Sequence, residues 1–302
     1  MVKLCDTFSK KIVVHMDIFW HFFINFYSAY SPAVKNKQFS QNTIDLFRSL
    51  ICNCLEDFLN KLVQFEEFYN VQLLETLIEN TDCSLGFILV TNKVLQKLVS
   101  NHNDTVTRVN IVLYLDMIFT ALTKCYILLM KEDKLYAQLL ISAAHLISRS
   151  SNEQFAEIEV ILCKNLVAPY LWNSLLAYDT WITVCRVSNM EYRFEVLVWM
   201  IENFQQILRT HNTFRPQFII LSNFIGELFC LLSTDYKLSF IRKYSLNTNH
   251  LFVWKHIGLK YIPNSCLTLV QNHLSHMCDR MEKFSIGKCT YADYLIMVTL
   301  YT

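Results

Sequence analysis

Glycine and proline are scarce in this sequence, and that scarcity restricts its fold more than any other feature. Four glycines and four prolines occur among 302 residues, whereas soluble globular chains average about 7% glycine and about 5% proline. A β-sandwich or β-barrel needs a turn roughly every 8–12 residues, and a dinucleotide-binding sheet needs glycines at its phosphate turn. The sequence therefore predicts an all-α protein whose helices are joined by polar loops.

Apolar residues recur at helical spacing in several segments. From Ile44 to Leu62 they recur at intervals of three and four, which predicts a helix that starts after Ser40 or Asn42. A capping box at 151–154 predicts a second helix start, because the serine oxygen and the Gln154 side chain can satisfy the first free amides. A third stripe, over 191–208, predicts another helix.

Polar clusters divide the chain into segments of one or two helices. They lie at residues 31–42, 79–84, 100–104, 131–134, 148–153, 209–216 and 245–250. No low-complexity linker separates two halves, so residues 1–302 are predicted to form a single continuous array. Hairpins of roughly 40 residues that bury their apolar faces only against their neighbours make a HEAT/armadillo-like α-solenoid of stacked helical hairpins.

The last residues of the sequence bear on the extent of this array. The chain ends on the apolar stretch "YADYLIMVTLYT", which has no capping signal. A solenoid should end on a polar outer face. We therefore expect this chain to be a fragment of a longer solenoid or a shortened homologue.

Charge and cysteine content limit the classes of function. The chain carries 27 Lys and Arg against 26 Asp and Glu, scattered along its length, so strong direct binding to nucleic acid is not expected. Eleven cysteines lack the short-loop pattern of secreted disulfide proteins, which favours reduced thiols and the cytosol or nucleus.

The apolar run Ile12–Tyr27 spans about 16 residues where a membrane helix needs about 20, and it contains Asp17. We expect a buried helix there rather than an anchor.

No sequence motif for catalysis or cofactor binding can be found in this chain. Glycine-rich phosphate loops, nucleophile elbows and H-E-x-x-H patterns are all absent, so we predict no catalytic, cofactor-binding or metal-binding residues and no enzyme activity. The best metal candidate is the group His273, His276 and Cys278, with Cys266 and Cys289 nearby. No C-x-x-C pair completes a zinc site, which favours ordinary surface and core roles. An enzyme built on this group is the weakest alternative.

The segment "SLLAYDTWITVCR" carries an aspartate and an arginine on either side of a tryptophan. On a helix, Asp179 and Arg186 share a face, while Trp181 belongs to the apolar arc. Seven residues separate the two charges by about 10.5 Å, too far for an ion pair within the helix. We therefore expect each charge to meet a partner on an adjoining helix or loop, and Asp179, Trp181 and Arg186 to hold helix geometry rather than perform catalysis.

Three blocks share their order and nearly their spacing with a known family. Residues 155–181 are similar to F-A-E-L-D followed by S-L-L-A-x-D-x-W, and Arg186 follows them. Residues 218–245 are similar to L-I-x-L-S, L-F and L-x-F-I-x-K-F-S, and residues 251–263 match L-x-x-W-x-H-I-x-x-x-x-[LI]-P. In these blocks the chain resembles the fidgetin-like-1-interacting regulator of recombination and mitosis family, over about a third of its 302 residues.

The resemblance implies a non-catalytic nuclear regulator without a cofactor. Its partner would be an AAA ATPase of the fidgetin-like type, which would hydrolyse the ATP. Together they would limit filaments of the RecA-like recombinase on single-stranded DNA, in homologous recombination, DNA repair and meiosis. The alternative is a helical adaptor of a cytoplasmic trafficking or signalling complex, for which the resemblance is generic solenoid similarity.

Two residues of the third block are the best candidates for partner contact. Trp254 and His256 lie in a short segment with polar flanks. Exposed tryptophan is enriched among the residues that anchor interfaces. We therefore expect Trp254 and His256 to be exposed and to contact the partner.

Overall fold

The computed structural model describes most of the chain as two compact units. The described residues are 16–30, 40–65, 68, 84–100, 110–131, 133–209, 216–245, 250–257, 261–266, 268, 272 and 275. The N-terminal unit is Met1–Thr180 and the C-terminal unit is Trp181–Thr302. The boundary falls inside one helix, and each unit is described by itself. Whether residues 1–302 form one continuous array stays a prediction.

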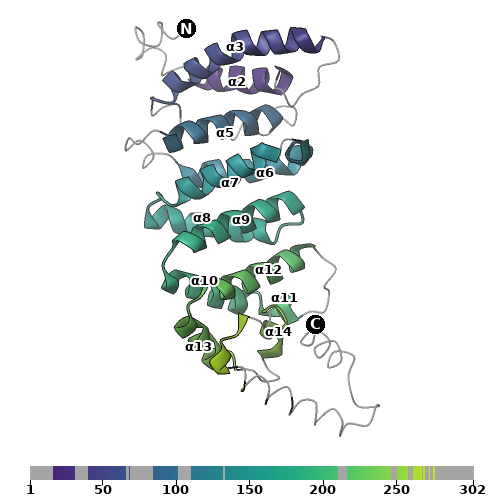
Figure 1. Ribbon diagram of the computed structural model, residues 1–302. Coiled ribbons are helices and arrows are strands. Elements are labelled where there is room, and N and C mark those ends of the chain that lie inside the picture. Colours follow the sequence, from purple (N-terminus) through teal and green to yellow (C-terminus); the bar gives the residue numbers. More distant parts are fainter. Residues whose placement is uncertain are drawn as a thin grey trace. The chain divides into compact units, whose positions relative to one another are not determined.

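The described residues are helical and contain no strand, so the predicted all-α class is confirmed. The helices are α2 (Met16–Tyr30), α3 (Gln41–Leu62), α5 (Ser84–Ser100), α6 (Ile111–Lys131), α7 (Asp133–Ile147), α8 (Asn152–Leu166), α9 (Leu171–Val187), α10 (Met190–Asn203), α11 (Gln205–Arg209), α12 (Pro216–Leu231), α13 (Thr234–Lys243) and α14 (Leu251–Trp254) (Figure 1).

Side-chain caps explain where several helices begin. Ser40 caps α3, since its Oγ accepts the Thr43 N–H at 3.3 Å. Ser151 and Gln154 form the predicted capping box of α8, with both bonds at 3.3 Å. Asn189 caps α10 by accepting the Tyr192 N–H at 2.8 Å. The two predicted starts are confirmed, and α10 begins at Met190, one residue before the stripe predicted over 191–208.

One predicted helix is divided in the structure. The stripe over 191–208 forms α10 and the short α11, and the two are separated at Phe204. The Phe204 N–H still bonds the Met200 carbonyl at 3.0 Å, but its φ and ψ of −99° and 15° leave the helical region. Apolar spacing continues through such a break, so periodicity alone could not locate it.

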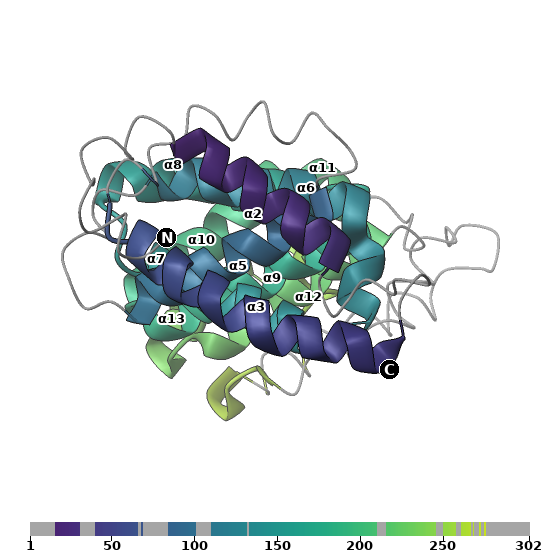
Figure 2. The same ribbon diagram turned by 90° about the horizontal axis from the view of Figure 1, so that it is seen from above.

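Aromatic side chains build the first layers of the N-terminal unit. Figure 2 shows α2 and α3 side by side, and their contact includes Phe23 and Phe58, whose ring centroids lie 5.8 Å apart. Trp20 stacks on Phe68 at 4.9 Å and donates its indole N–H to the Phe68 carbonyl at 2.9 Å. Trp20 and Phe23 are buried, so the described part of the apolar run, from Met16 onward, is a helix with a buried face, while residues 12–15 lie outside the described residues. None of the described helices combines the length and apolar character of a membrane span.

A glycine sets the spacing between α2 and α5. A Cβ atom at Gly86 would collide with the Ile24 carbonyl oxygen and the Ser28 Oγ. The Gly86 N–H, one of the unpaired amides in the first turn of α5, donates to the Ser28 Oγ at 3.0 Å. Further along the chain, α5 packs against α6 and α7, and α6 packs against α8. Helices of this unit thus pack on helices close to them in sequence.

The core of the C-terminal unit lies among α10, α12, α13 and α14. Phe224, Phe229 and Phe240 are fully buried. Trp181, at the start of this unit, contacts Phe224 at 5.2 Å and donates its indole N–H to the Tyr192 hydroxyl at 3.0 Å. Trp181 is 2% exposed, so it packs into the core of this unit.

Candidate functional site

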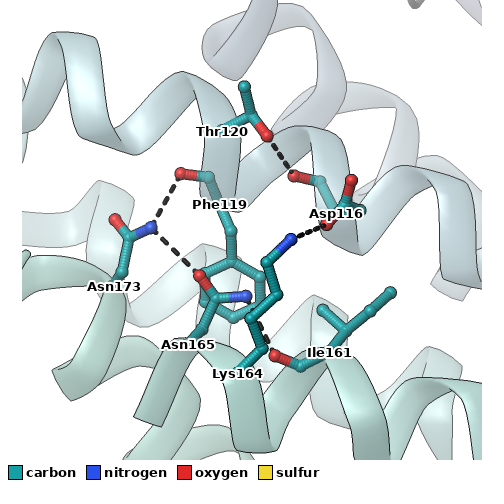
Figure 3. Close-up of polar contacts among 7 residues, drawn as sticks. All are labelled: Asp116, Phe119, Thr120, Ile161, Lys164, Asn165 and Asn173. Atoms are coloured by element: carbon teal, nitrogen blue, oxygen red, sulfur yellow. Dashed lines mark hydrogen bonds and ion pairs between the residues drawn. The ribbon is translucent and has the colours of Figure 1, made fainter. Parts of the chain in front are cut away.

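A buried amide pair links three helices of the N-terminal unit (Figure 3). Asn173 of α9 donates to the Phe119 carbonyl of α6 at 2.9 Å and to the Asn165 Oδ1 of α8 at 3.1 Å. Asn165 donates in turn to the Ile161 carbonyl at 2.9 Å. Both amides are almost completely buried. Because a buried polar group is costly unless it is bonded, the pair fixes how α6, α8 and α9 meet.

One amide oxygen of this pair is unbonded, and an exposed ion pair lies beside it. The Oδ1 of Asn173 has no hydrogen-bond partner among the described residues. On the surface beside the pair, the Lys164 Nζ lies 3.7 Å from the Asp116 Oδ1, and the two side chains are 74% and 48% exposed. An exposed ion pair of this kind contributes little to stability. The buried amides, rather than this ion pair, define the junction.

Asp179 meets its partner on a neighbouring helix of the N-terminal unit. The Tyr136 hydroxyl of α7 donates to the Asp179 Oδ2, and the Tyr136 ring packs edge-on against Trp172 at 6.0 Å. Burial raises the pKa of Tyr136 most, and the bonded Asp179 carboxylate raises it further. The partner on an adjoining helix agrees with the sequence expectation for Asp179.

Replacing Asp179 with alanine should lower the free energy of unfolding by about 1–3 kcal/mol, because the Tyr136 hydroxyl loses its acceptor. Urea denaturation followed by circular dichroism measures this. Tyr136→Phe removes the same bond from the other side, so the double variant should lose less than the sum of the two single losses. Strictly additive losses would contradict a direct bond.

Arg186 also meets its partner on another helix. Its guanidinium bonds and pairs with the Glu227 carboxylate of α12. The Arg186 side chain is more than half exposed, so the pair is worth roughly 0–1 kcal/mol. Its position on another helix agrees with the expected inter-helix partner, and we expect its contribution to stability to be smaller than that of Asp179.

Arg193 is bonded to three backbone carbonyls of the C-terminal unit. Its guanidinium donates to the carbonyls of Arg186 and Ser188 at 2.8 and 2.7 Å, at the end of α9. It also donates to the Leu231 carbonyl at 3.2 Å, at the end of α12. The last carbonyls of a helix lack partners within it and attract a cation. Arg193 therefore joins two helix C-termini to α10.

Replacing Arg193 with methionine should cost about 1–3 kcal/mol of unfolding free energy, because three carbonyls lose a charged donor. Arg193→Lys keeps the charge but not the planar fork, so it should recover only part of the loss. Differential scanning calorimetry of the three proteins tests this order. A lysine variant as stable as the parent would show that charge alone matters.

The structure contradicts the expected exposure of Trp254 and His256. Trp254 is 1% exposed and His256 is 9% exposed. The Trp254 indole N–H donates to the Tyr244 carbonyl at 3.0 Å, and its ring meets Phe229 and Phe240 edge-on. The polar flanks suggested a surface segment, but the helical turn of α14 directs its apolar side chains into the core. These two residues are structural in this unit.

His256 packs against α12, where a glycine again allows two parts of the backbone to come close together. Its Nδ1 lies 2.7 Å from the Ser222 Oγ, and its ring meets Phe218 edge-on at 5.3 Å. A Cβ atom at Gly226 would lie 2.7 Å from the His256 carbonyl oxygen, so the glycine permits this contact. Burial, and then the adjacent Lys255, lower the pKa of His256 to about 3, against a smaller opposing effect of the Leu208 backbone.

The lowered pKa predicts a pH dependence of stability. Between about pH 6.5 and pH 3 the unfolded chain binds a proton at His256 that the folded chain excludes, so stability should fall as pH falls, by up to about 1.4 kcal/mol per pH unit. The difference in unfolding free energy between the parent and His256→Asn, measured across this range, isolates the effect from the carboxylates. Parallel curves for the two proteins would contradict it.

The candidate metal group cannot be placed. His273, His276, Cys278 and Cys289 lie outside the described residues. Cys266 is described, as a partly exposed free thiol. Within the described part of the chain, no three His, Cys, Asp or Glu side chains are grouped as a metal ion would require.

Sequence reasoning missed several residues that organise the units, yet each carries a signal. Gly86 and Gly226 are single glycines inside helical patterns, a feature that often marks a close backbone approach. Arg193 lies near the positive end of a helix, where a cation is disfavoured unless it has specific acceptors. Asn173 is a polar residue in the first turn of a largely apolar helix. Tyr136 carried no signal that distinguishes it from other tyrosines.

Comparison with known proteins places the chain in a family. A family model matches residues 1–294, which is nearly the whole chain. No curated protein and no solved structure matches it. The chain belongs to the family that this model describes, Domain of unknown function (DUF4487).

Proposed function

We propose that this protein is a non-catalytic, HEAT/armadillo-like helical scaffold that binds an AAA ATPase of the fidgetin-like type. Through that partner it limits filaments of a RecA-like recombinase on single-stranded DNA, in homologous recombination and DNA repair in the nucleus. The observation that carries the proposal is the resemblance of the three blocks within 155–263 to the regulator family. Scaffold and ATPase divide the work, because ATP hydrolysis belongs to the partner.

The roles of the block residues support a scaffold. Asp179 bonds Tyr136, Arg186 bonds Glu227, and Trp254 fills the core of its unit. Each contact joins one helix to another, and none aims two chemical groups at a common reacting atom, as acid–base catalysis requires. The resemblance thus lies in residues that set helix packing, which is what a family of binding scaffolds shares.

Helix packing within each unit supports the solenoid part of the proposal. In the N-terminal unit, α5 packs on α2, α6 and α7, and α6 packs on α7 and α8. In the C-terminal unit, α10 packs on α11 and α12. In a solenoid each hairpin contacts only the hairpins beside it in sequence. Such arrays bind partners through long surfaces rather than through one deep pocket.

Affinity purification from nuclear extract tests the proposal. The tagged full chain should recover a fidgetin-like AAA ATPase, identified by mass spectrometry. The amount recovered should be the same with and without nuclease treatment. Nuclease treatment matters because recovery through shared DNA would not require direct binding. Recovery of coat or kinase components without the ATPase would contradict the proposal and favour the cytoplasmic adaptor.

A further inference from the structure

The outward face of α10 combines an exposed tryptophan with carboxylates. The helix buries Val196, Leu197, Met200 and Ile201 on its inner side. At about 100° per residue, the opposite side carries one continuous stripe. We call this stripe the α10 face, and it consists of Glu191, Glu195, Trp199 and Glu202, all exposed.

The charges of the α10 face are only partly balanced within the protein. Glu202 pairs with the Lys243 ammonium at 2.8 Å and accepts the Tyr244 hydroxyl at 3.4 Å. Glu191 and Glu195 form no ion pair or hydrogen bond with the described residues. The face is therefore negative on a chain whose formal net charge is +1.

Trp199 adds a flat aromatic surface to this negative face. Its ring meets Phe204 edge-on at 6.2 Å, yet 44% of the residue remains exposed. Residues three and four apart on a helix have Cβ atoms about 5–6 Å apart, so Trp199 has Glu195 on one side and Glu202 on the other. A cation above the indole would reach a carboxylate at the same time.

We propose that the α10 face is a docking surface for an arginine-rich segment of a partner protein. A guanidinium stacks on an indole and bonds a carboxylate through its planar fork, and an ammonium can do only part of this. Phosphate-bearing surfaces, whether nucleic acid or anionic lipid, are repelled by the same carboxylates. The proposal goes beyond the ATPase partner proposed above and does not depend on it.

Fluorescence anisotropy with a labelled peptide tests the docking surface. The probe is a peptide in which arginine alternates with alanine, added to the full chain at about 0.15 M salt. Saturable binding is expected. Trp199→Ala should weaken it roughly two- to fivefold, and Glu195→Gln should weaken it roughly two- to fivefold. The lysine version of the peptide should bind more weakly than the arginine version, and the glutamate version should not bind.

Matched variants in the N-terminal unit separate this surface from general charge. Glu157→Gln changes the charge of an exposed glutamate on α8, and Tyr170→Ala removes an aromatic side chain that is 53% exposed. Both should leave peptide affinity unchanged. If Trp199→Ala alters the melting curve, Trp199→Leu keeps an apolar contact to Phe204 while removing the aromatic face, and it should weaken binding equally.

Three results would overturn the docking surface. The first is no saturable binding of the arginine peptide to the full chain. The second is equal weakening by the α8 and α10 substitutions, which would reflect charge alone. The third is unchanged affinity in Trp199→Ala and Trp199→Leu, which would remove the tryptophan from the contact.

Discussion

Gly86→Ala should destabilise the N-terminal unit by at least about 3 kcal/mol, the upper end of overpacking costs. The added methyl group would collide with the backbone carbonyl of Ile24 as well as with the Ser28 Oγ. A flexible side chain could move away, but a carbonyl within α2 cannot move without shifting the helix. Chemical denaturation followed by far-ultraviolet circular dichroism measures the loss.

The expected loss of stability in Gly86→Ala is opposite in sign to the usual effect of this substitution in a helix. Inside an ordinary exposed helix, Gly→Ala stabilises by roughly 1 kcal/mol because alanine has the better helix propensity. The double variant Gly86→Ala with Ser28→Ala removes the side-chain collision and leaves the carbonyl collision, so it should remain strongly destabilised. A single variant that is as stable as the parent, or more stable, would show that α2 and α5 do not approach as closely as described.

Trp254→Ala should lower the unfolding free energy of the C-terminal unit by about 3–5 kcal/mol, the range for large-to-small changes in a core. The substitution removes a fully buried ring from between Phe229 and Phe240. It also leaves the Tyr244 carbonyl without the indole donor at 3.0 Å. Differential scanning calorimetry of the isolated protein is the appropriate measurement, because no partner is needed for the effect.

Trp199 provides the matched control for Trp254. It is a tryptophan of the same unit but is 44% exposed, and Trp199→Ala should cost less than about 1 kcal/mol. Trp254→Phe should fall between the two, since it keeps much of the packing and loses the hydrogen bond. Equal stability of the parent and Trp254→Ala would return Trp254 to the role of an exposed contact residue.

Helix content and most helix boundaries were predictable because they depend on local features. The near absence of glycine and proline, the apolar spacing from Ile44 to Leu62 and the Ser151 capping box are properties of neighbouring residues. The resulting helices α3 and α8 start where expected. A break set by a local change of φ and ψ, as at Phe204, has too little sequence around it to be recognised.

Contacts between helices were predictable only in part. The spacing of Asp179 and Arg186 excluded an ion pair within the helix and led to partners elsewhere, but could not name Tyr136 or Glu227. The burial of Trp254 depends on Gly226, which lies 28 residues earlier and admits the His256 carbonyl. No local pattern around Trp254 carries that information, and the polar flanks of its segment suggested the opposite.

Direct binding between purified proteins tests the proposed scaffold function most closely. Isothermal titration calorimetry of the full chain into a purified fidgetin-like AAA ATPase should give a saturable, stoichiometric heat, and the two proteins should co-elute from a sizing column. The same binding should persist without ATP and without DNA, because the scaffold is proposed to hold the ATPase itself. Absence of both the heat and the co-elution, with each protein folded, would contradict the proposed function.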